Sequence, residues 1–439
     1  MHATLLALLN QFPVPRRYVI ALSGGCDSVA LLHAIKHIQP QLDCQEIIAV
    51  HIDHGLQSAS VNWSVHCRRL CEQHNIPLTV IGLNLTFAKG ESLEAVARHA
   101  RYTAFAQFLE DQDMLLLAHH QNDQAETLLL QLFRGSGVSG LACMPAITQV
   151  GHTWLARPLL TLTRATIEHY AREQQLSWVD DPSNQETRFD RNFLRHDIMP
   201  VLESRWPALT TTLARVAQHQ GETKGLLADL AQIDWHVCQA QTPNQISLHG
   251  LRQLSEPRAR NLLRYWIATI CQAPLPDSVH LQRILAEVLP AAVDAMPQVS
   301  WANVRLRRYR EALYLELDPA GEDIHAWHSP WDLHDALLLP TGESLVTRRV
   351  SGAGLVIDAE TPPITVKYRQ GGERCRLQGR AHHHELRKLF QHWGVPPWQR
   401  DRIPLIYIGQ ELAQIVGYSV CEPYCAKSGQ SGIDIYLQH

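Results

Sequence analysis

The sequence predicts an α/β protein in which a Rossmann-like parallel sheet comes first, a helical domain second and a small mixed α+β domain last. Three observations predict this order. Short apolar runs alternate with helix-periodic segments until about residue 200, long helical patterns follow, and short strands around one helix end the chain. Continuous apolar strands separated by helices are typical of βαβ units and of a parallel sheet.

Each expected element has its own pattern in the sequence. Apolar runs predict the first four strands, at Tyr18–Leu22, Glu46–Ile52, Leu78–Leu83 and Asp113–His120. Helical periodicity predicts the helices between and after them, at Ser28–Ile38, Ser58–His74, Ser92–Gln112 and Asp123–Phe133. A fifth unit with a helix at Thr163–Gln175 follows. Beyond it we expect helices at Leu209–Ala240, Leu251–Ile270, Ser278–Leu289 and His384–Trp393, and one strand in "VRLRRYREALYLEL".

Composition narrows the class of protein. The 439 residues are 45% hydrophobic and 19% charged, and no apolar run reaches the roughly 18 residues that a membrane-spanning helix needs. The ten cysteines include no C-x-x-C pair, which predicts reduced thiols in a cytoplasmic protein. The net charge of −4 hides a basic region, because residues 364–402 hold nine Lys or Arg and three Asp or Glu.

The segment "SGGCDS", Ser23–Ser28, joins the first expected strand to the first helix. Its six residues are candidates for phosphate binding because glycines let backbone N–H groups approach a phosphate, and the helix N-terminus adds partial positive charge. A carboxylate at Asp27 is unfavourable beside phosphate unless a divalent cation lies between them. The loop therefore suggests a Mg²⁺–pyrophosphate site that contains Ser23, Gly24, Gly25, Cys26, Asp27 and Ser28.

A second polar group follows the fourth strand. Asp123 and Glu126 are three residues apart on an expected helix and so share a face, with His119 and His120 just before it. Such a group could bind a metal or transfer protons. Taken alone, the pattern rather favours an N-capped amphipathic helix with solvated acids, because acids are common in the first turn of a helix. The ends of parallel strands meet at one edge of a sheet, so both polar groups and the "DHG" segment after the second strand are expected there.

These motifs together resemble a known family. "SGGCDS" resembles the S-G-G-x-D-S signature of the PP-loop N-type ATP pyrophosphatases. "EAVARHARY", "HHQNDQAET" followed by "RGSGVSGLACM", "RPLL", and "DPSN" followed by "RNFLR" are similar to motifs of the tRNA(Ile)-lysidine synthetases, and residues 371–420 resemble their terminal domain. The chain departs from that pattern at Asn122, where the family usually has aspartate, which implies weaker metal binding there.

The resemblance implies a bacterial, cytoplasmic ligase, a homodimer in some members, with ATP and Mg²⁺ as cofactors. It would join free L-lysine to the wobble cytidine of a CAU-anticodon tRNA(Ile) through an adenylated base, and so change codon specificity from AUG to AUA. Implied catalytic residues are Asp27, Arg98, His119, Asp123, Glu126 and Arg195 (or Arg191), with Asp27 and Asp123 as metal ligands. His51, in the region Val50–Asp53, would meet the adenine. The "GSGVSGL" loop would close over the site.

The resemblance also implies a division of the chain. We expect a catalytic domain over residues 1–217, a mostly helical substrate-specificity domain over 218–320, a linker with short strands over 321–361 and a tRNA-binding domain over 362–439. The basic side chains of the last domain are candidate tRNA contacts. They are Arg374, Arg376, Arg380, Arg387, Lys388, Arg400 and Arg402. Trp393, Trp398 and Tyr368 are expected to pack internally.

Three alternatives remain open at this point. A tRNA thiolase would share the first domain but use paired cysteines, which this chain lacks. An amidotransferase-type synthetase acting on a small molecule would leave the basic C-terminal region unexplained. A non-catalytic RNA-binding protein with a decayed nucleotide domain has only Asn122 in its favour.

Overall fold

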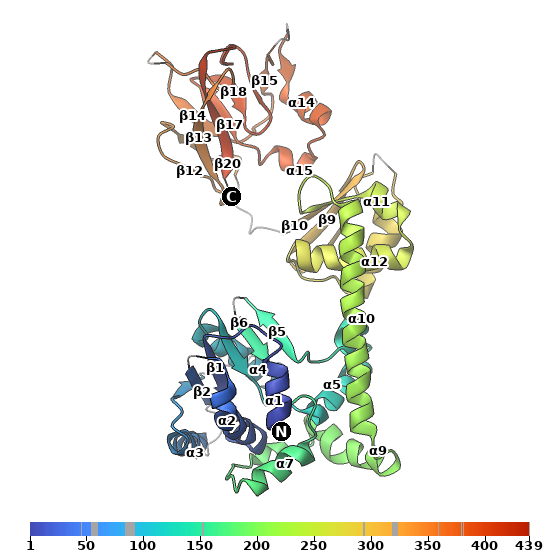
Figure 1. Ribbon diagram of the computed structural model, residues 1–439. Helices are drawn as coiled ribbons and strands as arrows, with labels where there is room; N and C mark the ends of the chain where they lie inside the picture. Colours follow the sequence, from blue (N-terminus) through green and yellow to red (C-terminus); the bar gives the residue numbers. More distant parts are fainter. Residues whose placement is uncertain are drawn as a thin grey trace. The chain divides into compact units, whose positions relative to one another are not determined.

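A computed structural model of the chain describes residues 1–44, 46–53, 60–83, 93–151, 153–292, 295–317, 324–358, 360–378, 380 and 382–438. The chain divides into two compact units, Met1–Leu230 and Ala231–His439. Figure 1 labels their helices and strands. The "DHG" segment extends from Asp53 into residues outside the described ranges.

The first unit is built on a six-stranded sheet of order β3-β2-β1-β4-β6-β5. Five strands are parallel, and β5 pairs antiparallel with β6. The strands are β1 Arg17–Ala21, β2 Glu46–Asp53, β3 Leu78–Gly82, β4 Asp113–Leu116, β5 Ile147–Val150 and β6 Thr153–Ala156. The expected Rossmann-like sheet is therefore confirmed, and β1, β4 and β6 lie side by side at its centre.

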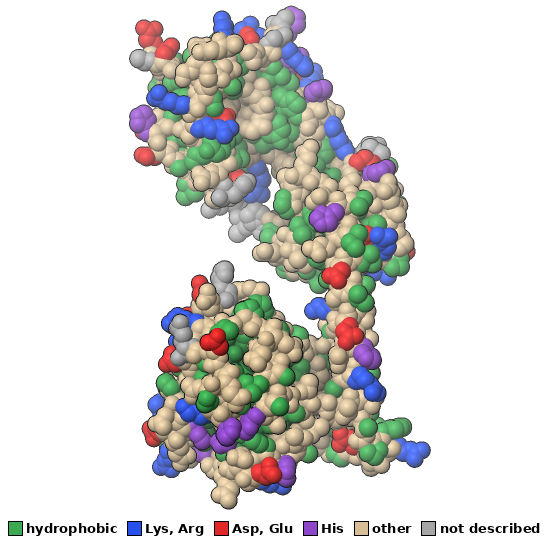
Figure 2. Space-filling model, viewed as in Figure 1, with side chains coloured by type: hydrophobic (Ala, Val, Ile, Leu, Met, Phe, Trp, Pro, Cys, Tyr) green, Lys and Arg blue, Asp and Glu red, His purple; other side chains and the backbone are tan. Residues whose placement is uncertain are grey.

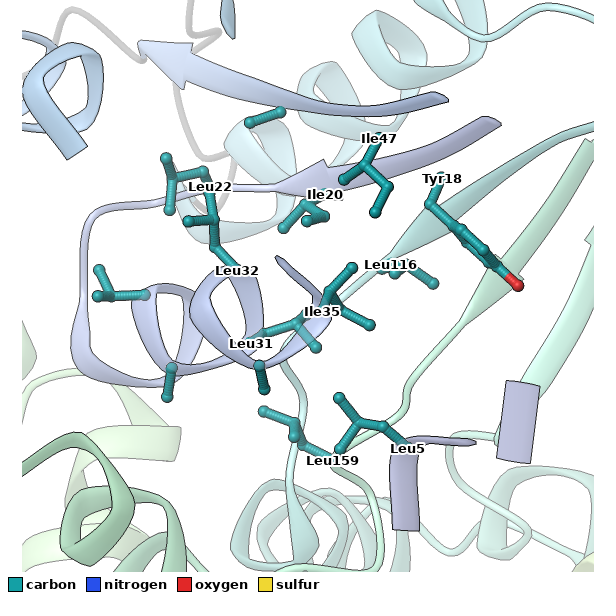
Figure 3. Close-up of a cluster of buried hydrophobic side chains, with 14 of the residues drawn as sticks. Leu5, Tyr18, Ile20, Leu22, Leu31, Leu32, Ile35, Ile47, Leu116 and Leu159 are labelled. Carbon is teal, nitrogen blue, oxygen red and sulfur yellow. The ribbon is translucent and has the colours of Figure 1, made fainter. Parts of the chain in front are cut away.

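Helices cover both faces of this sheet (Figure 1). They are α1 His2–Leu9, α2 Cys26–Ile38, α3 Ser60–Gln73, α4 Leu93–Phe108, α5 Gln121–Phe133, the short α6 Val138–Leu141 and α7 Arg164–Glu173. Apolar side chains of α1 and α2 pack on one face of the sheet, where Leu5, Leu31 and Ile35 are fully buried (Figure 3). The core positions the turns at the ends of β1, β4 and β6, which carry the polar motifs.

Three further helices follow, and the last of them extends into the second unit. Short α8 Asp190–Phe193 continues into a π-helical turn, Leu194–Ile198, and then into α9 Met199–Arg205. The long helix α10 follows over Leu209–Cys238. Its bounds match the expected helix at Leu209–Ala240 within two residues.

The middle of the chain differs from expectation in two places. The expected helix at Leu251–Ile270 is two helices, α11 Leu248–Gln253 and α12 Glu256–Tyr265 with a π turn to Ile270, because Ser255 and Pro257 start a new helix there. The expected single strand is a hairpin of β9 Val304–Tyr309 and β10 Ala312–Leu317. Arg310 makes the turn with φ of 52°. With β7 Gln245–Ser247 and β8 Gln298–Trp301 the hairpin forms a four-stranded sheet, against which α13 Ser278–Arg283 packs.

In the described residues from 324 onward, the structure has three sheets and two helices. A five-stranded sheet has the order β11-β14-β17-β18-β19, a three-stranded sheet β12-β13-β20, and β15 pairs with β16. The strands are β11 His328–Pro330, β12 Leu337–Leu338, β13 Ser344–Ser351, β14 Ile364–Lys367, β15 Arg374–Cys375, β16 His384–Glu385, β17 Leu405–Ile408, β18 Glu411–Ile415, β19 Ser419–Val420 and β20 Ser431–Gln438. The helices are α14 Leu386–Trp393 and α15 Pro397–Arg400. The mixed α+β class is confirmed.

Two expectations about the whole chain can be compared with this structure. Cys375 and Cys421 are joined by a disulfide, so the expectation of reduced thiols throughout is wrong for this pair. Two chain segments far apart in sequence, β15 and the end of β19, bring these cysteines together in a buried cluster that residue spacing did not reveal. Among the described residues, no helix is both long and apolar enough to cross a membrane.

Candidate active site

The glycine loop, residues 23–28, joins β1 to α2, and hydrogen bonds of its two serines stabilise its conformation. Ser23 Oγ and Ser28 Oγ are 3.0 Å apart, and Ser28 Oγ donates to the Gly25 carbonyl at 2.9 Å. Gly24 has φ of 88°, and a Cβ there would lie 3.2 Å from Cys67 Sγ, so the loop requires glycine at this position. The first turn of α2 follows at once, leaving its backbone N–H groups to face a ligand.

Asp27 lies in this first turn, and its two carboxylate oxygens have different surroundings. Its Oδ2 lies 3.7 Å from His120 Nε2, whereas its Oδ1 is buried and has no hydrogen-bond partner among the described residues. Burial raises the pKa of Asp27, Asp123 raises it further, and His120 and Arg164 act in the opposite direction. A buried carboxylate oxygen without a donor is suited to a cation that arrives with the substrate.

His120 connects the two expected polar groups. It caps α5 through two hydrogen bonds. Its ring Nδ1 accepts from the Asp123 backbone N–H at 3.4 Å, and its backbone N–H donates to Asp123 Oδ2 at 3.0 Å. An accepting Nδ1 leaves the proton on Nε2, which faces Asp27 Oδ2 and lies 3.5 Å from Asp123 Oδ2. The structure thus brings His120 against Asp27, although His119 was the predicted catalytic histidine.

The acidic pair on α5 is neutralised by two arginines. Glu126 is 2% exposed, and its Oε2 and Oε1 accept from Arg191 Nε at 2.8 Å and Arg195 Nε at 2.7 Å. Both guanidiniums also reach Asp123 Oδ1, at 3.3 and 3.2 Å. Arg191 and Arg195 are four residues apart on consecutive helical segments, and both arginines that the RNFLR motif offered lie at the site. The pair is therefore not a set of solvated surface acids.

Other predicted site residues lie further from this centre. Arg98 is exposed on α4, where its Nη2 lies 3.5 Å from the Tyr102 hydroxyl, and the side chain of Glu94 lies outside the described residues. His51 is 4% exposed on β2, and its Nδ1 lies 2.8 Å from the Leu22 carbonyl, so it supports the loop from behind. Burial raises the pKa of the Cys26 thiol to about 12, which keeps it neutral at pH 7. The predicted lid loop contains α6, and Ser136 Oγ anchors it to Gln131.

The residues of the loop and of α5 fit a magnesium ion that brings its own further ligands. Asp27 offers a free oxygen, whereas both oxygens of Asp123 are already engaged by His120 and the arginines. No group of three metal-binding side chains occurs in the described part of the chain. Mg²⁺ usually keeps several waters and phosphate oxygens and needs one or two carboxylates, so the site fits it through Asp27 rather than equally through both aspartates.

Asn122 has a structural role that the sequence did not show. Its Oδ1 accepts from the Arg164 backbone N–H at 3.0 Å, which is the first residue of α7. This bond satisfies a helix-terminal N–H group that has no partner within the helix. A carboxylate could accept the same bond, so asparagine here is compatible with an intact site.

Substitutions at Asn122 are expected to follow that role. Asn122→Asp should retain pyrophosphate release within about threefold, because the acceptor oxygen is preserved. Asn122→Ala should lower the free energy of unfolding by about 1 kcal/mol through the missing cap. Steady-state kinetics and urea unfolding of the two variants would check this. A tenfold loss of activity in Asn122→Asp would contradict it.

His119 should make stability depend on pH. Burial lowers its pKa to about 3, with Arg157, Arg191 and Arg101 acting in the same direction and Asp123 opposing. The unfolded chain binds a proton at the ordinary pKa near 6.5, so it holds more protons than the folded chain between pH 6.5 and 3. Stability from this residue is complete above pH 6.5 and decreases on acidification. His119→Asn should flatten the stability profile in that window, as measured by urea unfolding at several pH values; an unchanged slope would contradict this.

A cavity of about 440 Å³ opens beside Glu126 and Arg195 within the first unit. Its lining contains four carboxylates and two arginines among twelve residues. The carboxylates are those of Glu126, Asp180, Asp181 and Glu203, and the arginines are Arg164 and Arg195. Asn122 also lines it. A polar cavity of this size next to the α5 pair can hold a small charged molecule such as an amino acid.

The fold and the glycine loop define the class of protein, an enzyme with a PP-loop nucleotide domain. Residues 1–202 match the PP-loop domain, residues 246–314 the TilS substrate binding domain and residues 364–437 the TilS substrate C-terminal domain. The tRNA(Ile)-lysidine synthase of Coxiella burnetii is 40% identical over 99% of this chain and 96% of its own. The one from Serratia proteamaculans is 39% identical over 96% of each.

The chain therefore belongs to the tRNA(Ile)-lysidine synthase family. It is an ATP-dependent ligase of the PP-loop class, as the motif resemblance predicted. The thiolase, amidotransferase and non-catalytic alternatives are set aside by full-length relatives of this one kind. The domain boundaries and the roles of individual site residues remain predictions.

Proposed function

We propose that the protein joins free L-lysine to the wobble cytidine of a CAU-anticodon tRNA(Ile), using ATP and Mg²⁺. The observation that carries this proposal is the convergence of Asp27, His120 and the α5 acids at one edge of the sheet. Family membership supplies the reaction class, and the names of the relatives supply tRNA(Ile) and lysidine. Lysidine formation would change the codon read from AUG to AUA.

The roles of the residues follow from their positions. Backbone N–H groups of residues 23–28 would bind the pyrophosphate, and Asp27 would hold the accompanying Mg²⁺, which stabilises charge on the leaving group. The cytosine C2 oxygen would attack the α-phosphate and give an adenylated base. Arg98 and Arg195 were the predicted ligands of that base, and Arg195 lies closer to the Asp27 group.

Lysine would occupy the cavity beside Glu126. Its ammonium group and its carboxylate both find partners there, because the lining carries four acids and two arginines. In the second step, the uncharged ε-amine of lysine would attack C2 of the adenylated cytosine. The C2–N bond would form as the C2–O bond breaks and AMP leaves. Lysine is thereby proposed to bind next to, and not on, the phosphate loop.

The bond broken in ATP tests this reaction class. ATP labelled at either the α or the γ phosphate would be incubated with protein, Mg²⁺, lysine and the tRNA. We expect AMP and pyrophosphate in equal amounts, formed only when tRNA is present. ADP and phosphate as products would contradict the proposal.

Basic side chains on the C-terminal domain are proposed to bind the tRNA backbone. Arg374, Arg387 and Lys388 are exposed on β15 and α14, where Figure 2 shows Lys and Arg side chains gathered. Two other basic residues of the predicted set have partners within the domain. Arg376 Nη2 lies 3.4 Å from Glu422 Oε2, and Arg400 Nε donates to the Val395 carbonyl at 2.9 Å. Trp398 packs against Tyr309 and Tyr314, and Tyr368 is 1% exposed.

Charge reversal at the three exposed positions should weaken tRNA binding. For every phosphate that the protein no longer neutralises, the slope of log affinity against log salt should decrease by about one. Filter binding of the triple variant Arg374→Glu, Arg387→Glu, Lys388→Glu at several salt concentrations measures this. Arg349→Glu, an exposed arginine on β13 of the same domain, is the control and should leave the slope nearly unchanged. Equal slopes in both variants would contradict the proposal.

A further inference from the structure

Arg157 is a buried arginine at the carboxyl end of β6, the edge of the sheet that carries the site. It is 7% exposed. Its Nη1 donates to the Pro145 carbonyl at 2.7 Å, and its backbone N–H donates to the Ala146 carbonyl at 2.8 Å. Its Nε is buried and has no hydrogen-bond partner among the described residues. The guanidinium is therefore only partly satisfied within the fold.

The charge of Arg157 has no acidic counterpart in its described surroundings. Burial lowers the pKa of the guanidinium, Arg98 lowers it as well, and only the neutral Tyr102 hydroxyl opposes them. Removing a cation from water without a compensating anion is costly. This differs from Arg191 and Arg195, whose charges are balanced by Asp123 and Glu126.

Two further arginines lie around the same tyrosine. Arg98 and Arg101 on α4 lie 5.1 and 5.8 Å from the centre of the Tyr102 ring. We call Arg98, Arg101, Tyr102 and Arg157 the Tyr102 cluster. His119 connects it to the site, since Arg157 and Arg101 lower the pKa of His119 while Asp123 raises it. The cluster thus lies near His119, which comes just before α5.

Holding the nearby chain segment does not explain the buried charge. The neutral amide of Gln124 already holds Met144, the residue before Pro145. Its Nε2 donates to the Met144 carbonyl at 2.9 Å, and its Oε1 accepts from the Met144 N–H at 3.1 Å. A neutral donor could serve Pro145 in the same way. The positive charge of Arg157 is therefore available to an anion in addition to the carbonyl that it holds.

We propose that the Tyr102 cluster, chiefly through Arg157, binds a phosphate group of the substrate. This group is the phosphodiester next to the reacting cytidine. The proposal rests on the proposed function. Nucleotide phosphate has the same chemistry, but strand order favours RNA, because β4 separates the loop after β1 from Arg157 after β6. Two strand spacings of about 4.8 Å each put roughly 10 Å between the two positions. A phosphate group next to the reacting base could reach Arg157 while the base lies at the phosphate loop.

The test uses full-length tRNA(Ile) in which single phosphates around the wobble cytidine are replaced by uncharged methylphosphonates. Affinity for each tRNA is measured with the parent protein, Arg157→Met, Arg157→Lys and the control Arg172→Met, which removes an arginine 72% exposed on α7. We expect Arg157→Met to weaken binding of unmodified tRNA about tenfold. One methylphosphonate should weaken parent binding by a similar factor and leave the binding of Arg157→Met unchanged.

Affinity for ATP is measured in parallel to distinguish the two sources of phosphate. Unchanged ATP affinity assigns the anion to tRNA, whereas a loss confined to ATP assigns it to the nucleotide. If every methylphosphonate weakens Arg157→Met as much as the parent and ATP affinity is unchanged, Arg157 binds no phosphate and the inference fails. Should Arg157→Met not fold, Arg157→Lys supplies a second comparison: it keeps the charge and loses the forked donors, so the same methylphosphonate should weaken its tRNA binding less than it weakens that of the parent, and an equal loss would contradict the inference.

This experiment is independent of lysine transfer. The coupling between Arg157 and one phosphate is read from tRNA affinity alone. A parent protein that shows this coupling but transfers no lysine would contradict the proposed reaction and leave the phosphate site standing.

Discussion

Asp27→Ala is expected to reduce pyrophosphate release by at least about 10²-fold, because charge on the leaving pyrophosphate loses the cation that Asp27 would hold. The Oδ1 of this carboxylate is buried without a partner among the described residues, and its Oδ2 faces His120. Pyrophosphate release is measured with saturating ATP, Mg²⁺, lysine and tRNA. Binding of tRNA should remain close to that of the parent.

Two variants serve as controls for Asp27. Asp27→Asn keeps the shape and should lose nearly as much activity as the alanine variant, because the negative charge is the feature required. Asp43→Ala removes an exposed acid of the same unit and should be neutral. Burial raises the pKa of Asp27, so parent activity should decrease on acidification at a higher pH than for an ordinary aspartate. Full pyrophosphate release by Asp27→Ala would contradict its role.

Glu126→Gln is expected to reduce both stability and activity. The substitution leaves Arg191 and Arg195 without the buried carboxylate that accepts from both of them. Breaking one side of a buried ion pair costs about 3–5 kcal/mol, and we expect about 2–4 kcal/mol here because both arginines are partly exposed. Urea unfolding measures this loss.

Activity and a surface control separate the two effects of Glu126→Gln. Activity should decrease at least about tenfold at temperatures where the variant stays folded, because the arginines and the cavity lining move together. Glu256→Gln breaks an exposed i,i+4 pair with Arg260 and should cost no more than about 0.5 kcal/mol. Equal stability losses in the two variants would show that the α5 pair is not a buried network.

The position of the site could be predicted because polar motifs follow strands whose carboxyl ends lie at the same edge of the sheet. Apolar runs indicated β1, β2 and β4, and the residues after β1 and β4 had to meet at one edge of a parallel sheet. Asp27 and Asp123 were therefore expected to be neighbours, and His120 lies within reach of both.

The choice between neighbouring residues could not be predicted. His119 and His120 are adjacent in sequence, and only the helix cap made by His120 determines which imidazole faces Asp27. Arg191 and Arg195 are four residues apart on consecutive helical segments and so share a face, but only tertiary packing shows that both reach Glu126. Arg157 belongs to the "RPLL" motif, and the unsatisfied state of its buried Nε among the described residues is visible only once tertiary packing is known.

The hairpin of β9 and β10 was expected as one strand for a local reason. Alternation in "VRLRRYREALYLEL" continues through the turn at Arg310, so the pattern did not separate β9 from β10. Arg308 in this run is fully buried and donates to main-chain carbonyls of Leu289 and Arg310, so the basic run is not a continuous charged surface.

Transfer of lysine to tRNA is the decisive test of the proposed reaction. Protein, ATP, Mg²⁺ and radiolabelled lysine would be incubated with a CAU-anticodon tRNA(Ile) transcript, with tRNA(Met), which shares the anticodon, as the specificity control. We predict label on tRNA(Ile) at the wobble cytidine, little on tRNA(Met), and none without ATP. Absence of label on tRNA(Ile) with a folded, ATP-binding protein would contradict the proposed function.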